Sequence, residues 1–164
     1  MKVPTPEQQR HIYLTQLQPY IAEPILALGF FTSAGYFDGL KSDYWMSGFI
    51  SMSSRMMGRF VQKERIAARV AESRNDLVAV TATWVFRFEF PKDGSAFVVS
   101  RQPDVWRRAD IRVTVDGKTS KYAQPVHVAF ADGEVQHFDI SSGGGGYATF
   151  SDAMRDLLLD PVSV

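Results

Sequence analysis

The four consecutive glycines at residues 143–146 are the first feature of this sequence that could carry chemistry. A glycine-rich loop that enters a helix can bind a phosphate group through its backbone amides. A loop of the P-loop type also needs Lys and Ser or Thr directly after the glycines, and here Tyr147, Ala148 and Thr149 follow. Because four glycines lose much conformational entropy when they are ordered, we expect a mobile corner rather than a phosphate site.

A histidine and an aspartate within residues 125–140 could form a catalytic pair. This segment alternates apolar and polar side chains around the dipeptide DG, which predicts a β-hairpin. We expect a three-residue loop, Asp132–Glu134, because that register collects the apolar side chains on one face. These side chains are Val126, Val128, Phe130, Phe138 and Ile140. His127 and Asp139 then face each other on the other side and could orient an imidazole as a base. No Ser or Cys nucleophile in a suitable context accompanies them, so we favour an exposed cross-strand pair.

Other chemistry-bearing residues give no catalytic or metal-binding pattern. The three histidines, His11, His127 and His137, form no H-E-x-x-H motif and no His/Cys cluster in the sequence. The absence of cysteine excludes disulfides, thiolate metal ligands and cysteine nucleophiles. Acidic residues fall mostly in predicted turns and on helix exteriors, which does not favour a paired-carboxylate glycosidase. We therefore expect a non-enzymatic protein with no catalytic residues, no cofactor and no metal site.

The strongest positive signal is a basic face on the helix predicted for residues 46–72. Arg55, Arg59 and Lys63 follow one another at i+4 spacing, and Arg69 lies close by in angle. Such a face could bind a protein partner or lie on an anionic membrane. The alternative is a solvated face, or one paired with the acidic C-terminal third of the same chain.

A second candidate contact lies at Trp106, Arg107 and Arg108. Trp106 falls in a loop-like stretch beside these two arginines, and we expect it to be partly exposed at an interface. Other aromatic residues occur at strand alternation and are expected to fill the core rather than to stack on bases. Equal totals of 18 basic and 18 acidic residues also argue against a nucleic-acid partner.

Length and composition predict one ordinary domain, residues 1–164. Hydrophobic residues make up 45% of the chain, which is enough to bury a core. No signal peptide is evident, and the most hydrophobic segment, residues 25–31, is far shorter than the roughly 20 residues that span a bilayer. The absence of cysteine fits a reducing compartment. We expect a cytoplasmic protein.

The first half of the chain carries helical signals. A helix is predicted over residues 6–28, beginning at Pro6 and bent or broken before Pro24. Residues 29–45 combine glycines with aromatic side chains and predict a connector folded onto the rest of the protein. The helix at 46–72 follows this connector.

After Asn75 the pattern changes to short strands. Period-two alternation and turn residues predict strands at 77–80, 84–90, 96–100 and 111–115, followed by the hairpin at 125–140. A final amphipathic helix ends before Pro161. Its apolar stripe consists of Tyr147, Phe150, Met154, Leu157 and Leu158. Helices, then strands, then a helix predict an α+β fold rather than alternating βαβ units.

Three segments and this closing helix carry a resemblance to a known fold. The segments are NDLVAVTATWVFRFEF, VVSRQPDVWRRADIRVTV and VHVAFADGEVQHFDI. Together they resemble bacterial pleckstrin-homology-like (PH-like) domains over residues 75–160. The resemblance implies a strongly bent antiparallel barrel or sheet of about seven strands, with one open end plugged by the C-terminal helix. Residues 1–74 then form an extension of two N-terminal helices packed on the barrel, as in small actinobacterial proteins that this chain resembles.

The resemblance also bears on ligands. PH-like domains that bind phosphoinositides usually use basic residues in and around the loop that joins the first two strands. We expect this loop to be residues 81–83, TAT, which hold no cation. Phosphoinositide binding is therefore not carried over to this chain.

These patterns together predict a non-catalytic binding or scaffold module that recognises a protein or a peptide. The expected contact residues are Arg55, Arg59, Lys63, Arg69, Trp106, Arg107 and Arg108. One alternative is a peripheral module that binds an anionic membrane through the basic face. Another is a small-ligand carrier or enzyme with a cavity inside the barrel. The aromatic helical half is further expected to mask the barrel or to mediate homo-oligomerisation.

Overall fold

The computed structural model of the chain describes residues 4–34, 75–89, 99, 102–116, 123–141 and 148–160. Its elements are α1 (Pro6–Leu17), η1 (Gln18–Tyr20), β1 (Ala27–Ser33), β2 (Asn75–Val80), β3 (Trp84–Glu89), β4 (Asp104–Arg107), η2 (Arg108–Asp110), β5 (Ile111–Val115), β6 (Ala123–Phe130), β7 (Val135–Ser141) and α4 (Ala148–Leu159). Several predicted features lie outside the described residues: the helix at 46–72 with Arg55, Arg59, Lys63 and Arg69, most of the strand at 96–100, and the glycines at 143–146.

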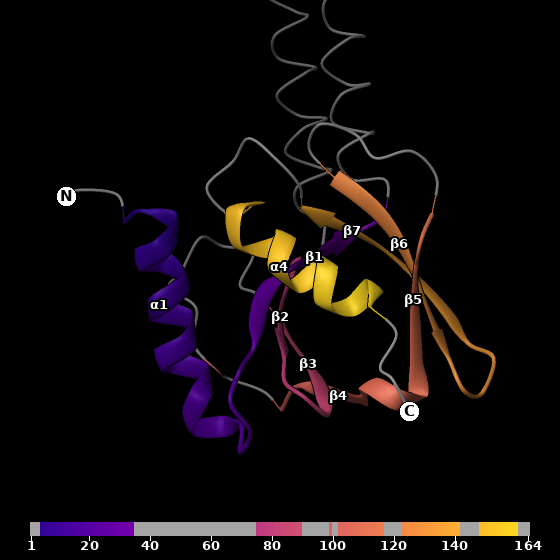
Figure 1. Cartoon of the computed structure of the whole chain (residues 1–164), viewed down its shortest axis with the longest axis horizontal. Helices are drawn as coiled ribbons and strands as arrows, with labels where there is room; N and C mark the ends of the chain where they lie inside the picture. The colour runs from indigo at the N-terminus through magenta and orange to yellow at the C-terminus, as the bar shows by residue number, and fades with distance from the viewer. Residues whose placement is uncertain are drawn as a thin grey trace, which may run out of the picture.

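The seven strands form one antiparallel sheet in the order β4-β3-β2-β1-β7-β6-β5. Its two outermost strands, β4 and β5, are consecutive in the chain and are joined by the three residues of η2. Three residues cannot cross the width of a flat seven-stranded sheet, because neighbouring strands lie about 4.8 Å apart. The sheet therefore curls until its opposite edges meet at η2, as Figure 1 shows. This arrangement confirms the predicted α+β class and the antiparallel sheet.

The central strand β1 corrects the prediction for residues 27–33. The sequence pattern assigned them to the end of a helix and to a connector, whereas they pair with β2 on one side and with β7 on the other. Every residue from Ala27 to Thr32 is buried, because α1 covers one face of β1 and α4 covers the other. A strand buried on both faces lacks the alternation of apolar and polar residues by which strands are recognised.

The first helix, α1, begins at Pro6 as predicted but is shorter than predicted. Thr5 caps it, since the Gln8 N–H donates to Thr5 Oγ1 and the Thr5 N–H donates to Gln8 Oε1. The α-helix ends at Leu17, and Pro19 lies in the 3-10 turn η1. Because proline lacks an N–H and its ring clashes with the preceding turn, the α-helical hydrogen bonding cannot continue there.

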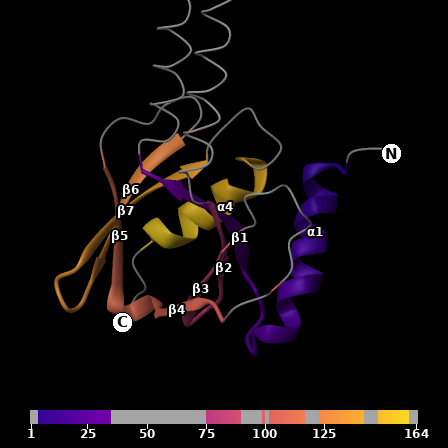
Figure 2. The same cartoon turned by 180° about the vertical axis from the view of Figure 1, so that it is seen from behind.

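Two apolar clusters hold the sheet, one on each face. On the outer face, Tyr13 and Leu17 of α1 pack with residues of β1, β2 and β3. On the inner face, Met154 and Leu158 of α4 pack with residues from six strands, and we call this cluster the inner core. Its buried members are Ala27, Phe31, Val78, Val80, Val85, Val113, Val126, Val128, Ile140, Met154 and Leu158. Figures 1 and 2 show α4 within the curl of the sheet and α1 outside it.

The helix α4 also forms a hydrogen bond to β1, next to the point where β1 begins to pair with β7. β1 pairs with β7 from Phe31 to Ser33, and just before this pairing the Phe30 N–H donates to the buried Ser151 Oγ at 3.2 Å. Gly29 lies directly under Met154, where a Cβ atom would come within 2.7 Å of Met154 Sδ and Cε. The close approach of helix and strand therefore requires glycine at this position.

The β6–β7 hairpin has a three-residue loop that begins one residue earlier than predicted. The Phe130 N–H donates to the Glu134 carbonyl at 2.8 Å, so the loop consists of residues 131–133. Gly133 ends the loop with φ of 89°, the left-handed conformation that this loop type needs at its last position. The predicted apolar face is confirmed, because all five of its side chains lie in or against the inner core.

The predicted pairing of His127 with Asp139 is wrong. His127 faces His137 across the hairpin, and Asp139 faces Pro125 on one side and Thr32 on the other. The earlier loop shifts the cross-strand partners by two positions, which exchanges partners without moving any side chain to the other face. Asp139 is buried within the sheet, so the proposed exposed His–Asp pair does not form.

Candidate functional site

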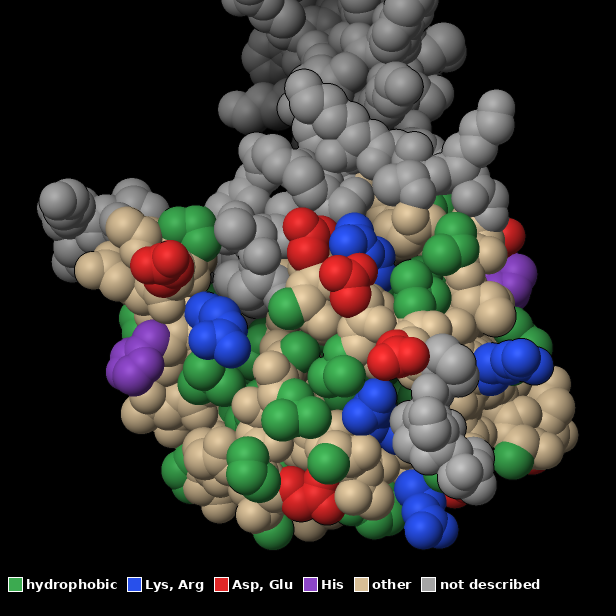
Figure 3. All heavy atoms as spheres, in the orientation of Figure 1, with side chains coloured by type: hydrophobic (Ala, Val, Ile, Leu, Met, Phe, Trp, Pro, Cys, Tyr) green, Lys and Arg blue, Asp and Glu red, His purple; other side chains and the backbone are tan. Residues whose placement is uncertain are grey.

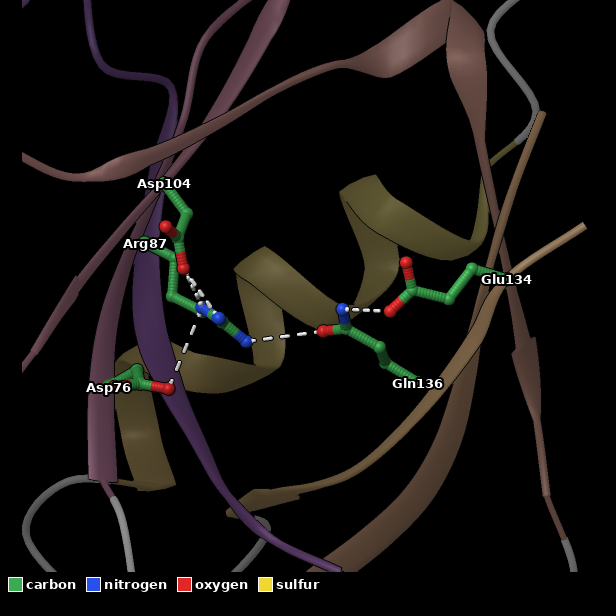
Figure 4. Close-up of polar contacts among 5 residues, drawn as sticks. All are labelled: Asp76, Arg87, Asp104, Glu134 and Gln136. Carbon is green, nitrogen blue, oxygen red and sulfur yellow. Dashed lines mark hydrogen bonds and ion pairs between the residues drawn. The ribbon is translucent and has the colours of Figure 1, made fainter. Parts of the chain in front are cut away.

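A mostly buried arginine occupies the inner face of the sheet in the middle of β3. Side chains alternate along a strand, so Arg87 shares its face with Val85, a member of the inner core. The Arg87 side chain is 12% exposed, and its Nε lies 3.7 Å from Oδ2 of Asp76, which is 3% exposed. On the other side, Arg87 Nε and Nη2 both donate to Asp104 Oδ2 of β4. Two carboxylates therefore flank the guanidinium, as Figure 4 shows.

Arg87 also connects the two halves of the sheet. Its Nη1 donates to Gln136 Oε1 of β7 at 3.3 Å, and Gln136 Nε2 donates to Glu134 Oε1 at 2.8 Å. Because β2 and β1 lie between β3 and β7 in the sheet, this chain of contacts crosses the interior of the curl (Figure 4). The ring centres of Trp106 and Phe138 lie 5.1 and 5.4 Å from the guanidinium carbon, within cation–π range.

These side chains, which we call the Arg87 cluster, brace the sheet from inside. Every guanidinium nitrogen of Arg87 donates a hydrogen bond, and two carboxylates offset its charge. Few N–H donors and little net positive charge therefore remain to bind an external anion. Trp106 was predicted in a loop-like stretch at an interface, but it lies half-buried on strand β4 and packs against the inner core. Its ring packs edge-on against Phe130, with centroids 5.1 Å apart. The Arg87 cluster is therefore a structural element.

The edge of the sheet at β5 has a different character. Among the described strands, β5 pairs with β6 alone. Backbone hydrogen bonds flank β5 at both ends: the Ala131 N–H donates to the Asp110 carbonyl at 3.1 Å, and the Asp116 N–H donates to the Pro125 carbonyl at 2.9 Å. These bonds fix which residues of β5 direct their backbone groups toward β6.

The backbone groups of every second residue of β5 point away from β6. In an antiparallel pair, every second residue forms backbone hydrogen bonds to the partner strand. Asp110 and Asp116 form such bonds at the two ends of the β5–β6 pair, so the backbone groups of Arg112 and Thr114 also point toward β6. The N–H and C=O groups of Val113 and Val115 therefore point away from β6, on the side of β5 where no described strand pairs with it. This side, which we call the β5 edge, presents backbone groups of the kind on which another strand can form.

Apolar side chains flank the β5 edge. Val113 belongs to the inner core and Ile111 is half-buried against it, whereas the residue Val115 is 48% exposed. Leu157 and Leu159, near the C-terminal end of α4, are partly buried against the same core, and α4 contacts β5. An extended segment laid along the edge would thus find backbone partners next to apolar side chains.

The two arginines predicted as contact residues lie in different environments. Arg107 is exposed at the end of β4. Arg108 is half-buried, and its guanidinium donates to the carbonyls of Thr81 and Ala82, each at 3.2 Å, and of Leu157 at 3.1 Å. It therefore ties the β2–β3 turn to the last turn of α4, where the helix dipole favours a cation.

Replacing Arg108 with alanine is expected to lower the free energy of unfolding by about 2 kcal/mol, because three carbonyls lose a charged donor. Urea denaturation followed by circular dichroism measures this change. Arg107→Ala is the matched control, and its exposed side chain predicts a change within about 0.5 kcal/mol. Equal stability of the two variants would show that the Arg108 contacts contribute nothing.

Glu23 also contacts the β2–β3 turn. Its Oε2 accepts the Thr83 N–H at 3.1 Å. Hydrogen bonds from the Thr81 and Thr83 side chains and from the Thr83 backbone lower the pKa of Glu23 below its ordinary value of 4.5. A carboxyl with a lowered pKa in the folded state stabilises the protein above its unfolded-state pKa, and this contribution is lost as the pH falls through the folded-state pKa.

The Thr83 amide resonance is therefore expected to titrate with a midpoint below pH 4.5, because its hydrogen bond weakens when Glu23 is protonated. An NMR titration measures this midpoint. The Glu23→Gln variant is expected to lose the transition. A midpoint at or above the ordinary value, or an unchanged transition in the variant, would refute the assignment.

Comparisons of the chain with protein-family models, with curated proteins and with solved structures returned no match. Within the described ranges, no helix combines the length and the apolar character needed to cross a lipid bilayer. The function proposed below therefore depends on the fold, the sequence resemblance and the geometry of the β5 edge.

Proposed function

We propose that this protein is a non-catalytic binding module with a PH-like fold that recognises an extended peptide. The observation that carries the proposal is the β5 edge, where Val113 and Val115 direct N–H and C=O groups away from the sheet. A peptide can add to such an edge as a further strand, with its backbone supplying affinity and its alternate side chains supplying specificity. A curled seven-stranded antiparallel sheet with a C-terminal helix in its opening supports the PH-like assignment.

The interior of the sheet favours the edge over a small-ligand cavity. The contact from Arg87 to Gln136 crosses the curl, and α4 packs into it with Met154 and Leu158. These contacts within the curl support a packed interior rather than a ligand cavity. A binding function is therefore better placed on the edge strand.

A random-peptide phage library tests the proposal, with the affinity of the selected peptide measured by fluorescence polarisation. Val115→Pro removes the one N–H that points outward at this position and leaves the bonds to β6 intact. Losing a backbone hydrogen bond of about 1.4 kcal/mol predicts a roughly tenfold weaker complex.

The control is Val115→Ala, which shortens the same side chain but keeps the N–H. Its affinity is expected to stay within about threefold of the wild type, since the backbone bond remains. Both variants should unfold at temperatures close to that of the wild type. Failure to select any peptide, or equal binding to the proline variant, would rule out strand addition at the β5 edge.

A peripheral membrane function is the second candidate. PH-like domains that bind phosphoinositides usually use the segment between their first two strands, and the structure gives this chain a different segment there from the one expected from the sequence. The first two strands of the sheet along the chain are β1 and β2, so the segment that joins them is residues 34–74 and not residues 81–83. That segment holds seven Lys or Arg against four Asp or Glu, including the basic residues singled out in the sequence. On the face shown in Figure 3, by contrast, acidic and basic side chains of the described residues are interspersed.

Co-sedimentation with lipid vesicles separates this candidate from peptide binding. Phosphatidylcholine vesicles with added phosphatidylserine should pellet the protein at low salt, and high salt should release it because the attraction is screened. The triple reversal Arg55/Arg59/Lys63→Glu should abolish pelleting. Equal pelleting with neutral vesicles, or by the triple variant, would remove the membrane candidate and leave peptide binding unaffected.

A further inference from the structure

Two of the three histidines of the chain lie side by side on the outer face of the β6–β7 hairpin. His127 and His137 are directly opposite each other, with ring centroids 4.3 Å apart. The bond from the Phe130 N–H to the Glu134 carbonyl sets the alternation along the hairpin. This alternation makes the histidines a non-hydrogen-bonded pair, the kind in which opposing side chains come closest.

Asp116 brings a carboxylate to the same point. Its Oδ2 lies 2.5 Å from His127 Nε2 and 3.9 Å from His137 Nδ1, and the three donor atoms all lie within 4.8 Å of one another. The backbone bond from Asp116 to Pro125 holds this residue beside β6. Among the described residues, His127 Nε2 is buried from solvent and has no hydrogen-bond partner, although Asp116 Oδ2 lies 2.5 Å from it.

We propose that Asp116, His127 and His137 form a binding site for a divalent transition-metal ion, with Zn²⁺ as the first choice. Imidazole and carboxylate donors lie about 2.0 to 2.2 Å from bound zinc, so donor atoms around one ion lie roughly 3 to 4 Å apart. Small rotations of these side chains, which are one-third to one-half exposed, bring them to such separations. An ion at this point would also give the buried His127 nitrogen a partner.

The donor set selects the class of metal. Two imidazoles and one carboxylate suit Zn²⁺ and Cu²⁺ and leave further coordination positions open to water or to a ligand. The chain has no cysteine to compete for the ion, and its remaining histidine, His11, lies on α1. A bound ion would link the end of β5 to β6 and β7 and so stabilise the folded state.

Isothermal titration calorimetry with zinc chloride at pH 7.5 tests the site. One zinc ion is expected to bind per chain. His127→Ala, His137→Ala and Asp116→Asn should each weaken binding by at least about tenfold, because each removes one of three ligands. His11→Ala is the matched control and should bind zinc like the wild type. Thermal unfolding without metal checks that every variant is folded.

Proton NMR gives a second readout, because a chain with three histidines has three imidazole Hε1 signals. Zinc should shift the signals of His127 and His137 and leave that of His11 in place. Binding of Cu²⁺ alone, lost in the same variants, would support the site with copper as its ion. No binding of either ion, or undiminished binding by a His127→Ala/His137→Ala double variant, would overturn the proposal.

Discussion

Replacing Gly29 with valine is expected to destabilise the protein by about 3 kcal/mol, because it overpacks the contact between β1 and α4. A Cβ atom at position 29 would lie 2.7 Å from Met154 Sδ and Cε and 3.1 Å from Met154 Cβ. The end of the methionine side chain can turn away, but its Cβ moves only with the helix. The valine therefore forces α4 outward and weakens its contacts in the inner core.

Thermal or urea unfolding followed by circular dichroism measures this loss, and two further variants identify its cause. Combining Gly29→Ala with Met154→Ala should cost less than the sum of the two single changes, because the second removes the atoms that the first meets. At Gly133 a Cβ would meet no atom within 4 Å, so Gly133→Ala reports only the strain of a side chain at positive φ. A Gly29→Val variant as stable as the wild type would mean that Met154 of α4 does not pack closely against Gly29 of β1.

Replacing Arg87 with methionine should lower the free energy of unfolding by about 3 kcal/mol. Methionine keeps much of the volume but removes the cation next to Asp76, whose side chain is 3% exposed. A buried carboxylate is less favourable when a neighbouring cation is removed. The change also removes the contact to Gln136 that crosses the interior.

The double variant Arg87→Met/Asp76→Asn should recover part of the lost stability, because it also removes the buried negative charge that Arg87 faced. Arg112→Met provides the control, since Arg112 is exposed on β5 and should change stability by less than about 0.5 kcal/mol. Chemical denaturation of all three proteins makes the comparison. If Arg87→Met unfolds at the same urea concentration as Arg112→Met, the Arg87 cluster does not brace the sheet.

Strands β2, β3, β5, β6 and β7 could be predicted because turn residues separate them and they alternate apolar and polar side chains, whereas the sequence pattern predicted a loop at β4. The β2–β3 turn at residues 81–83 and the apolar face of the β6–β7 hairpin follow from that pattern. β1 could not be recognised in this way, because both of its faces are buried. The same difficulty applies to β3, where Val85 and Phe88 point to opposite faces and both are buried. Alternation along this strand puts Arg87 on the face opposite Phe86 and Phe88 but does not show that this face is the inner one, so the Arg87 cluster was missed.

The histidine pair was missed for a different reason. Both candidate loops of the hairpin contain three residues and keep the same side chains on the apolar face, so hydrophobicity cannot choose between them. Turn chemistry can choose, because a three-residue loop commonly ends on a residue in the left-handed conformation, and Gly133 is best suited to it. Placing Gly133 last gives the loop 131–133 and sets His127 opposite His137.

The β5 edge depends on sheet order, which local sequence patterns do not specify. β5 itself could be found from its own residues, but its place at the edge follows from the pairing of β1 with both β2 and β7. Once β1 lies in the centre, β4 and β5 become the outer strands. The proposed binding surface is thus a consequence of the element that the sequence pattern did not reveal.

Amide hydrogen exchange of β5, with and without a selected peptide, tests the proposed function most directly. In the free protein, the amides of Arg112 and Thr114 should exchange slowly because they bond to β6, and those of Val113 and Val115 should exchange faster. Saturating peptide should protect Val113 and Val115 and leave their neighbours as they were. Peptide binding that protects amides elsewhere in the chain, with Val113 and Val115 still exchanging at their original rates, would contradict strand addition at the β5 edge.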